Sequence, residues 1–341
     1  MTPFYAKDTP RDVPPDAPMN VLFVVYPDIV LLDLVGPLQV FTHATKGEGA
    51  GPAYRTHVVS LAGGATATNT ILPIGTDPLA DWLDPHCDVP IHTVVFVGGD
   101  GAIPAALDAD FVAQATVLAR RAGRVCSVCS GALVLAATGL LDGKRAVTHW
   151  EDCDKLAADY PAVAVEVDPI FIKDGHVWTS AGITAGIDMA LAMIEEDLGK
   201  PAAIAMARSL VAPMVRSGGQ SQFSAELDRQ ARDADGLFSP LHAWISDNLA
   251  RRLTVEDMAR ECGMSPRNFS RRYANVMGVS PAKALEVVRV DAARDLLATT
   301  DKGVKVIAKH CGFQDAERMR RAFLRVARTT PSKYRQQFRL T

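Results

Sequence analysis

The sequence predicts an α/β domain with a doubly wound, mainly parallel sheet, followed by an all-α domain with two helix-turn-helix units. Two observations support this prediction. Over residues 20–200, short β-branched runs alternate with helical patterns, which is typical of strands joined by crossover helices. After residue 236 the pattern is wholly helical, and the chain repeats itself. The length of 341 residues is enough for two domains.

Composition divides the chain into a tail, two domains and a linker. The predicted segments are a disordered, proline-rich tail at 1–18, an α/β domain at 19–216, a polar linker at 217–236 and a helical domain at 237–341. The tail lacks the basic start and apolar core of a signal peptide, and no apolar run is long enough to span a membrane. Six dispersed cysteines predict reduced thiols and a cytoplasmic protein.

The α/β domain begins with a strand, and its strands and helices then alternate. The predicted strands are 21–27, 54–62, 92–101 and 123–129. The predicted helices are 33–44, 104–122, 130–138 and 184–198, with one more at 199–216. In such sheets function gathers at the carboxyl ends of the strands.

Charge is distributed unequally between the two predicted domains. Residues 237–341 hold 20 Lys and Arg against 10 Asp and Glu, a net charge of +10, whereas the rest of the chain has a net charge of −13. A basic module on an acidic body is expected where one domain meets a polyanion and the other does not. A basic helical domain without that role is the alternative.

The helical domain contains an internal repeat. "MARECG" (258–263) recurs as "IAKHCG" (307–312), and "FSRRYANVMGVSP" (269–281) recurs as "MRRAFLRVARTTP" (319–331). Each copy has a short helix, a Cys-Gly turn and a second helix that contains several arginines. This is the pattern of two helix-turn-helix units.

The second helix of each unit is predicted to enter the major groove of DNA. In the first unit Ser265 would be the N-cap of this helix and Pro266 its first residue. Phe269 and Tyr273 in the first unit, and Met319 and Phe323 in the second, have the spacing of core residues. The second helix of the second unit also offers the acidic residues Asp315 and Glu317. Arg, Asn and Gln read base edges or hold phosphates, and a solvated helix face is the alternative for each arginine. The predicted DNA-binding residues are Arg267, Asn268, Arg271, Arg272, Gln314, Arg318, Arg320 and Arg321.

Residues 241–338 resemble the AraC family DNA-binding domain. The shared segments are "GVSPAKAL", "RVDAARDLL", "IAKHCGFQD" and "PSKYRQQF". The resemblance implies seven helices, with a rigid helix joining the two units so that both recognition helices enter successive major grooves. Met319 stands where the family has an aromatic residue, and Ala327-Arg328 replaces its usual aromatic-Gly pair.

In the α/β domain the segment "RVCSVCSGALVLAATGL" (124–140) places Cys129 at a strand-to-helix corner. A helix N-terminus lowers the pKa of a thiol and can hold an oxyanion. Cys129 is therefore a nucleophile, a pocket-lining thiol or an inert buried thiol. A redox pair is disfavoured because Cys126 lies on the strand, and a metal site because no second ligand cluster follows.

Two further loops would meet Cys129 at the same edge of the sheet. "VGGDGA" (97–102) would offer an oxyanion-hole amide from Gly99 or Asp100. Asp33, in the first strand-to-helix loop, would direct its carboxylate there. A carboxylate raises the pKa of a neighbouring thiol unless it is protonated and donates a hydrogen bond to the thiolate.

Residues 20–200 resemble the class I glutamine amidotransferase-like, PfpI-type superfamily, and most of all the branch found in GlxA-like AraC regulators and isocyanide hydratases. The resemblance lies in "LDLVGPLQVF", "FVGGDG", "CSGALVLAATGLLDGKRAVTHW" and "TSAGITAGIDMALAMIEEDLG". It implies that Cys129 holds the elbow position and Asp33 the acidic position, with His149 in the "T-H-W" segment. Ser130 stands where protease and amidase members have histidine, which weighs against a Cys-His hydrolase.

Together these features predict a transcription regulator that binds double-stranded DNA, has no cofactor or metal, does not contact a membrane and forms a homodimer through its N-terminal domain. The resemblance suggests a nitrogen-containing effector. One alternative is a hydratase or amidase that uses Cys129 and Asp33, with His149 as a further catalytic candidate; another is an α/β domain that only dimerises. The predicted effector-binding residues are Asp33, Gly99, Asp100, Cys129, Ser130 and His149.

Overall fold

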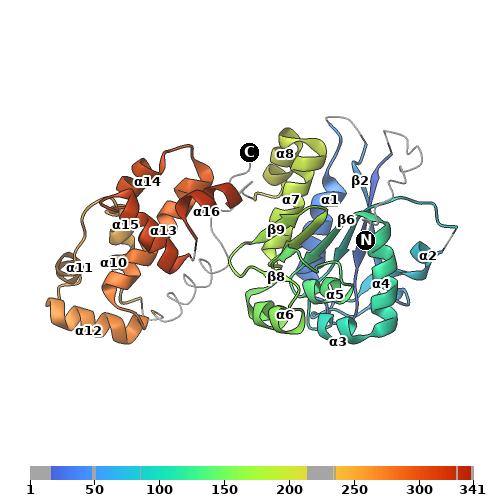
Figure 1. Cartoon of the computed structure of the whole chain (residues 1–341), viewed down its shortest axis with the longest axis horizontal. Helices are drawn as coiled ribbons and strands as arrows, with labels where there is room; N and C mark the ends of the chain where they lie inside the picture. The colour runs from blue at the N-terminus through green and yellow to red at the C-terminus, as the bar shows by residue number, and fades with distance from the viewer. Residues whose placement is uncertain are drawn as a thin grey trace. The chain divides into compact units, whose positions relative to one another are not determined.

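A computed structural model describes residues 17–47, 51–84, 86–212, 233, 236–327 and 329–338. The chain divides into two compact units, Met1–Met214 and Val215–Thr341, which are considered separately (Figure 1). Most of the predicted tail and linker lies outside the described residues, so the predicted segment boundaries stay predictions. No helix within the described ranges is long and apolar enough to cross a membrane.

The first unit contains an eight-stranded sheet in the order β3-β4-β2-β1-β5-β6-β10-β9. All neighbours from β4 to β10 are parallel, and only the two edge strands pair antiparallel, which confirms the predicted doubly wound sheet. The strands are β1 (Met19–Val24), β2 (Tyr54–Ser60), β3 (Gly64–Thr66), β4 (Ile74–Pro78), β5 (Ile91–Phe96), β6 (Ala122–Val128), β9 (Phe171–Asp174) and β10 (Val177–Ser180). A separate pair joins β7 (Arg145–Ala146) to β8 (Ala164–Val165).

Helices cover both faces of the sheet, which explains why its central strands are almost continuously buried. Helices α1, α7 and α8 pack together, and α3, α4 and α5 form a second group (Figure 1). The helices are α1 (Leu31–His43), α2 (Ala80–Leu83), α3 (Ala102–Leu107), α4 (Ala109–Arg121), α5 (Gly131–Ala137), α6 (Cys153–Asp159), α7 (Thr184–Leu198) and α8 (Lys200–Ser209).

The prediction of a single helix at 104–122 is wrong, because the chain forms two helices there, α3 and α4. Asp108 ends α3 in an extended conformation, and its carboxylate accepts hydrogen bonds from the amides of Asp110 and Phe111. An aspartate that caps a helix in this way satisfies amides that a continuous helix would otherwise satisfy. The break therefore follows from the N-cap preference of Asp108.

A buried ion pair joins the sheet to the helices behind it. Arg124 on β6 donates to Asp197 on α7 over 2.6 Å, and the Tyr54 hydroxyl on β2 donates to the same carboxylate over 2.7 Å. Both charged side chains are almost completely buried. Removing one partner would leave the other charge uncompensated, so the network strongly favours this packing of α7 on the sheet.

The second unit contains seven helices within its described residues, as the resemblance to the AraC domain implied. They are α10 (Ser239–Asp247), α11 (Val255–Glu261), α12 (Pro266–Met277), α13 (Pro281–Thr299), α14 (Val304–His310), α15 (Ala316–Val326) and α16 (Pro331–Phe338).

The seven helices enclose two small cores, and α13 contributes residues to both. The first core contains Phe269 and Tyr273, and the second contains Met319, Phe323 and Tyr334. Met319 is completely buried, so the methionine fills the second core where the family has an aromatic side chain.

Candidate functional site

Cys129 occupies the corner between β6 and α5, as predicted. Its φ is 54°, a backbone region that non-glycine residues rarely adopt. Hydrogen bonds on both sides hold this conformation. The Cys129 amide donates to the Ser180 carbonyl over 3.0 Å, and the Thr148 hydroxyl donates to the Cys129 carbonyl over 2.8 Å.

Two glycines pack directly against Cys129. A Cβ atom at Gly98 would lie 2.5 Å from the Cys129 Cβ, and one at Gly182 would lie 2.3 Å from it. Both distances are far below van der Waals contact, so any side chain at either position would displace the cysteine. The loops after β5 and β10 therefore enclose the residue, which is only 7% exposed.

Asp33 lies in the first turn of α1 and is completely buried. One carboxylate oxygen accepts a hydrogen bond from the Ile183 amide, which precedes α7 and has a φ of 50°. The other oxygen borders the same small space as the Cys129 side chain, because a Cβ at Gly98 would lie 2.8 Å from it. Burial raises the pKa of Asp33 to about 6, although the Ile183 amide and Cys129 act to lower it.

The electrostatic surroundings of Cys129 differ from the expectation for a helix N-terminus. Burial raises the pKa of its thiol well above the ordinary value, and the Asp33 carboxylate raises it further. A hydrogen bond from the Ser130 amide lowers the pKa but does not offset these effects. The pKa of the thiol is therefore raised, as expected beside a carboxylate, in spite of the helix N-terminus. The thiol is neutral at pH 7, where it is a poor nucleophile.

One of the two predicted oxyanion-hole amides, that of Gly99, is already engaged. The Gly99 amide donates to the Ser130 hydroxyl over 2.8 Å, and that hydroxyl donates to the Gly99 carbonyl over 2.9 Å. This two-way contact fastens the loop after β5 to the start of α5. Because the Gly99 amide is paired within the protein, an oxyanion would have to displace Ser130 to reach it.

His149 and Asp100 complete the predicted set, and both lie at the periphery of the site. His149 is partly exposed, and its ring nitrogen is 3.6 Å from Glu151. It lowers the pKa of Asp33 electrostatically, so it belongs to the surroundings of that carboxylate. Asp100 is exposed on the loop that follows β5.

Sequence analysis missed several residues that shape this site. The Tyr26 hydroxyl donates to the Val97 carbonyl, and burial raises the pKa of Tyr26, with smaller contributions from Cys129 and Asp33. In the sequence, the "TSAG" stretch before α7 indicated that Gly182 and Ile183 belong to a segment shared with the family, but not that they meet Asp33 and Cys129. No spacing rule connects residues about 150 positions apart to Asp33.

The structure bears on the redox and metal interpretations of the cysteines. All six cysteines are free. Cys126 is buried within β6, where burial raises the pKa of its thiol to about 12. Among the described residues, no group of three or more His, Cys, Asp or Glu side chains is placed to hold a metal ion.

In the second unit, the first recognition helix begins where the sequence predicted, and the structure supplies the start of the second, for which no start was predicted. Ser265 precedes α12 as its N-cap with Pro266 as the first residue, and Asp315 caps α15 by accepting a hydrogen bond from the Arg318 amide over 2.7 Å. The capping role explains why Asp315 lies among basic residues. All the predicted DNA-binding residues are exposed, namely Arg267, Asn268, Arg271, Arg272, Gln314, Arg318, Arg320 and Arg321.

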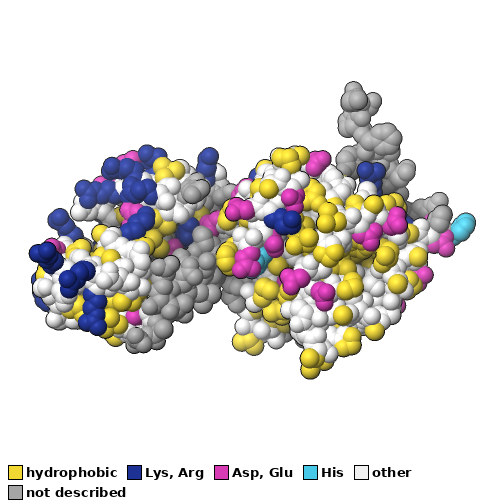
Figure 2. Space-filling view, turned by 90° about the horizontal axis from the view of Figure 1, so that it is seen from below, with side chains coloured by type: hydrophobic (Ala, Val, Ile, Leu, Met, Phe, Trp, Pro, Cys, Tyr) yellow, Lys and Arg dark blue, Asp and Glu magenta, His cyan; other side chains and the backbone are white. Residues whose placement is uncertain are grey.

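The two recognition helices differ in their ion pairs. Helix α12 contains no acidic residue, and Arg271 donates to the Asn268 side chain over 3.3 Å. In α15, Glu317 accepts two hydrogen bonds from Arg320, at 2.8 and 2.9 Å. Figure 2 shows Lys and Arg side chains gathered on the visible face of the second unit, which is the charge expected of a DNA-binding surface.

An α/β sheet with a cysteine elbow, followed in one chain by two helix-turn-helix units, defines a DNA-binding transcription regulator. A model of the DJ-1/PfpI family matches residues 19–196, and a helix-turn-helix domain model matches residues 258–337. The chain belongs to the DJ-1/PfpI family.

Three curated relatives illustrate the two kinds of protein that share this α/β domain. The chain is 30% identical to the transcriptional regulator GlxA of Rhizobium meliloti, over 83% of this chain and 86% of the relative. It is 26% identical to the regulator GbdR of Pseudomonas aeruginosa, over 88% and 80%. It is also 31% identical to an isonitrile hydratase of Pseudomonas putida, over 72% of this chain and 99% of the relative.

Proposed function

We propose that the α/β unit of this regulator binds a small nitrogen-containing metabolite at the Cys129 elbow, in the cytoplasm, and that binding controls transcription. The supporting observation is the buried pair of Asp33 and Cys129, which lie beyond the ends of β1 and β6. A buried carboxylate with a pKa of about 6 is poorly compensated in the absence of a ligand. An ammonium group or another N–H donor would stabilise its charged form.

The proposed binding site contains Asp33, Cys129, Ser130 and His149, with Gly99 and Asp100 on the adjoining loop. The neutral thiol serves as a pocket wall in this proposal, and its nucleophilicity is not needed. Regulation would then follow from the different affinity of the ligand for two states of the protein.

A homodimer formed through the α/β unit is part of the proposal. Leu32 and Val35 are exposed on α1, and Ile71 is 96% exposed on the neighbouring loop. The Leu31 amide donates to the Asn69 side chain over 3.0 Å, which holds this loop against the start of α1. Exposed apolar side chains that lie together are typical of protein-protein contacts.

Thermal-shift screening of the full chain against amines and amino acids tests the binding proposal, because a ligand that binds only the folded state raises the melting temperature. We expect Asp33→Asn to lose the shift and Asp142→Asn, an exposed aspartate of the same unit, to keep it. A ligand whose shift is unchanged by Asp33→Asn would contradict the assignment of the site.

The role of the thiol requires a second pair of variants. Cys129→Ser preserves size and hydrogen bonding, and we expect it to keep the effector response in a reporter assay. Cys129→Leu fills the pocket and should lose the response. A serine variant that binds the metabolite but no longer responds would contradict the pocket-wall role.

The alternative function is a hydratase or amidase reaction that uses Cys129 and Asp33. The similarity to an isonitrile hydratase along almost its whole length favours this candidate. The raised pKa of the thiol and Ser130 in the position of the histidine weigh against it. Turnover of an isocyanide by the wild type, abolished in Cys129→Ser, would establish the enzyme.

A further inference from the structure

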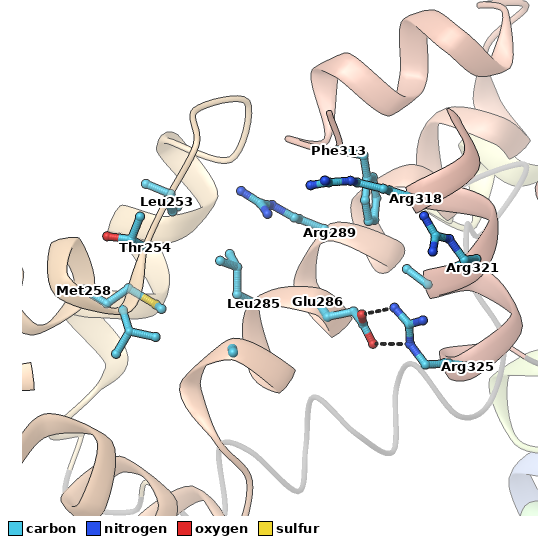
Figure 3. Close-up of a pocket in the computed structure, with 13 residues that line it drawn as sticks. Leu253, Thr254, Met258, Leu285, Glu286, Arg289, Phe313, Arg318, Arg321 and Arg325 are labelled. Carbon is cyan, nitrogen blue, oxygen red and sulfur yellow. Dashed lines mark hydrogen bonds and ion pairs between the residues drawn. The ribbon is translucent and has the colours of Figure 1, made fainter. Parts of the chain in front are cut away.

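A groove of about 580 Å³ lies between the two helix-turn-helix units (Figure 3). Its first wall is the start of α11, its floor is α13, and its second wall is the recognition helix α15. The residues that matter for the argument are Thr254 and Met258 on the first wall, Glu286 and Arg289 on the floor, and Arg318 and Arg321 on the second wall. Arg325 extends the second wall.

The groove is strongly basic. Four guanidinium groups, those of Arg289, Arg318, Arg321 and Arg325, line it together with one carboxylate, that of Glu286. Glu286 is already paired with two cations, because it accepts from Lys283 over 3.0 Å and from Arg325 over 2.5 Å. Its charge therefore does not neutralise the other three arginines.

Arg289 has spare hydrogen-bonding capacity. One terminal nitrogen donates to the Arg251 carbonyl over 3.0 Å, whereas its buried Nε has no hydrogen-bond partner among the described residues. Partial burial lowers the pKa of Arg289, so its charged form is poorly solvated. The Nε itself is buried, but Arg289 lines the groove, so an anion in the groove would stabilise its poorly solvated charge.

Two of the three arginines of the second wall, Arg318 and Arg321, are only weakly paired within the protein. Arg318 lies 3.7 Å from Asp315, and Arg321 lies 3.8 Å from Glu317, with all four side chains at least half exposed. Exposed pairs of this length contribute little free energy. Both guanidinium groups are therefore available to an external anion.

We propose that this groove holds the phosphate backbone of the DNA strand that crosses between the two major grooves read by α12 and α15, with Arg289 and Arg321 as phosphate contacts. The proposal rests on DNA binding by the second unit and is independent of the effector. The second wall belongs to a recognition helix, so DNA placed against α15 also lies along the groove. Arg289 comes from neither recognition helix, and the sequence did not identify it.

The test is equilibrium binding of the full chain to two fluorescent duplexes at several salt concentrations. One duplex is selected from a random pool by the wild type, and the other has a scrambled sequence. A phosphate contact contributes equally on both duplexes, and its loss lowers the slope of log affinity against log salt by about 1. We expect this result for Arg289→Gln and for Arg321→Gln.

Three further variants make the test selective. Arg289→Lys keeps the charge and should keep most of the slope, which separates loss of charge from loss of folding. Glu286→Gln removes the carboxylate from the groove and should strengthen binding to both duplexes. Lys333→Gln removes an exposed cation of α16 that does not line the groove and should leave the slope unchanged.

Several outcomes would overturn the proposal. An unchanged slope for folded Arg289→Gln would place the groove away from DNA. A loss of affinity confined to the selected duplex would make the tested arginine a base contact. Inorganic pyrophosphate that raises the melting temperature of the wild type but not of Arg289→Gln, together with unchanged DNA binding, would identify a small-anion site. Failure of the wild type to bind any duplex would instead contradict the function itself.

Discussion

The substitution Asp33→Asn should change the pH dependence of stability of the α/β unit. Burial raises the pKa of Asp33 from its ordinary value of 3.8 to about 6. Between these two values the folded state binds more protons than the unfolded state, so the free energy of unfolding falls as pH rises. At about 1.4 kcal/mol per pKa unit, the loss is about 3 kcal/mol by pH 7. Above the folded pKa the stability becomes constant again.

Asparagine has nearly the shape of aspartate and can still accept a hydrogen bond from the Ile183 amide, but it does not ionise. The stability of Asp33→Asn relative to the wild type should therefore rise by up to about 3 kcal/mol between pH 4 and pH 7.5. Urea unfolding monitored by tryptophan fluorescence measures this, since Trp82, Trp150 and Trp178 lie in the α/β unit. If the free energies of unfolding of the wild type and of Asp33→Asn changed in parallel with pH over this range, the assignment of a raised pKa to Asp33 would be refuted.

Three other substitutions test the packing and the DNA interface. Gly182→Ala should destabilise the α/β unit by about 3 kcal/mol or more, because its Cβ would collide with Cys129; an unfolding midpoint near that of the wild type would contradict the close approach. Asp197→Asn should cost about 3 kcal/mol in urea unfolding by leaving Arg124 buried without its counter-charge, and a loss below 1 kcal/mol would show that water reaches the pair. Arg271→Ala should cost about 1–3 kcal/mol at a selected duplex and relax one position of its sequence preference, whereas an equal loss on all sequences would make Arg271 a phosphate contact.

Local patterns in the sequence were sufficient to predict most of the fold. Alternation of β-branched runs and helical patterns predicted the parallel sheet, and the repeat near residues 258–331 predicted both helix-turn-helix units. Ser265 and Pro266 predicted the start of α12 correctly because the fixed φ of proline suits the first helical position, although the Ser265 side chain makes no capping hydrogen bond. The break at Asp108 follows from its N-cap preference, but the continuous helical pattern around it concealed the cap.

The candidate sites were harder to predict from the sequence than the fold, because their chemistry depends on long-range contacts. The position of Cys129 at a corner was predictable, and so was the effect of the Asp33 carboxylate on the pKa of its thiol. The burial that raises this pKa most was not predictable. The pairing of the Gly99 amide with Ser130 joins segments 31 residues apart. Arg289 resembles any other helix-surface arginine in the sequence. Only the packing of α13 between the two helix-turn-helix units places it in a groove.

The continuous helix α13 has a consequence for the DNA sequence that this regulator can recognise. It spans 19 residues, about 28 Å at 1.5 Å per residue, and contributes to the cores of both helix-turn-helix units. One extra base pair between the two contacted segments would separate them by about 3.4 Å and rotate them by about 35° around the DNA axis. A helix packed at both ends cannot absorb that rotation, so operator sites should tolerate base changes in the intervening segment far better than a change in its length.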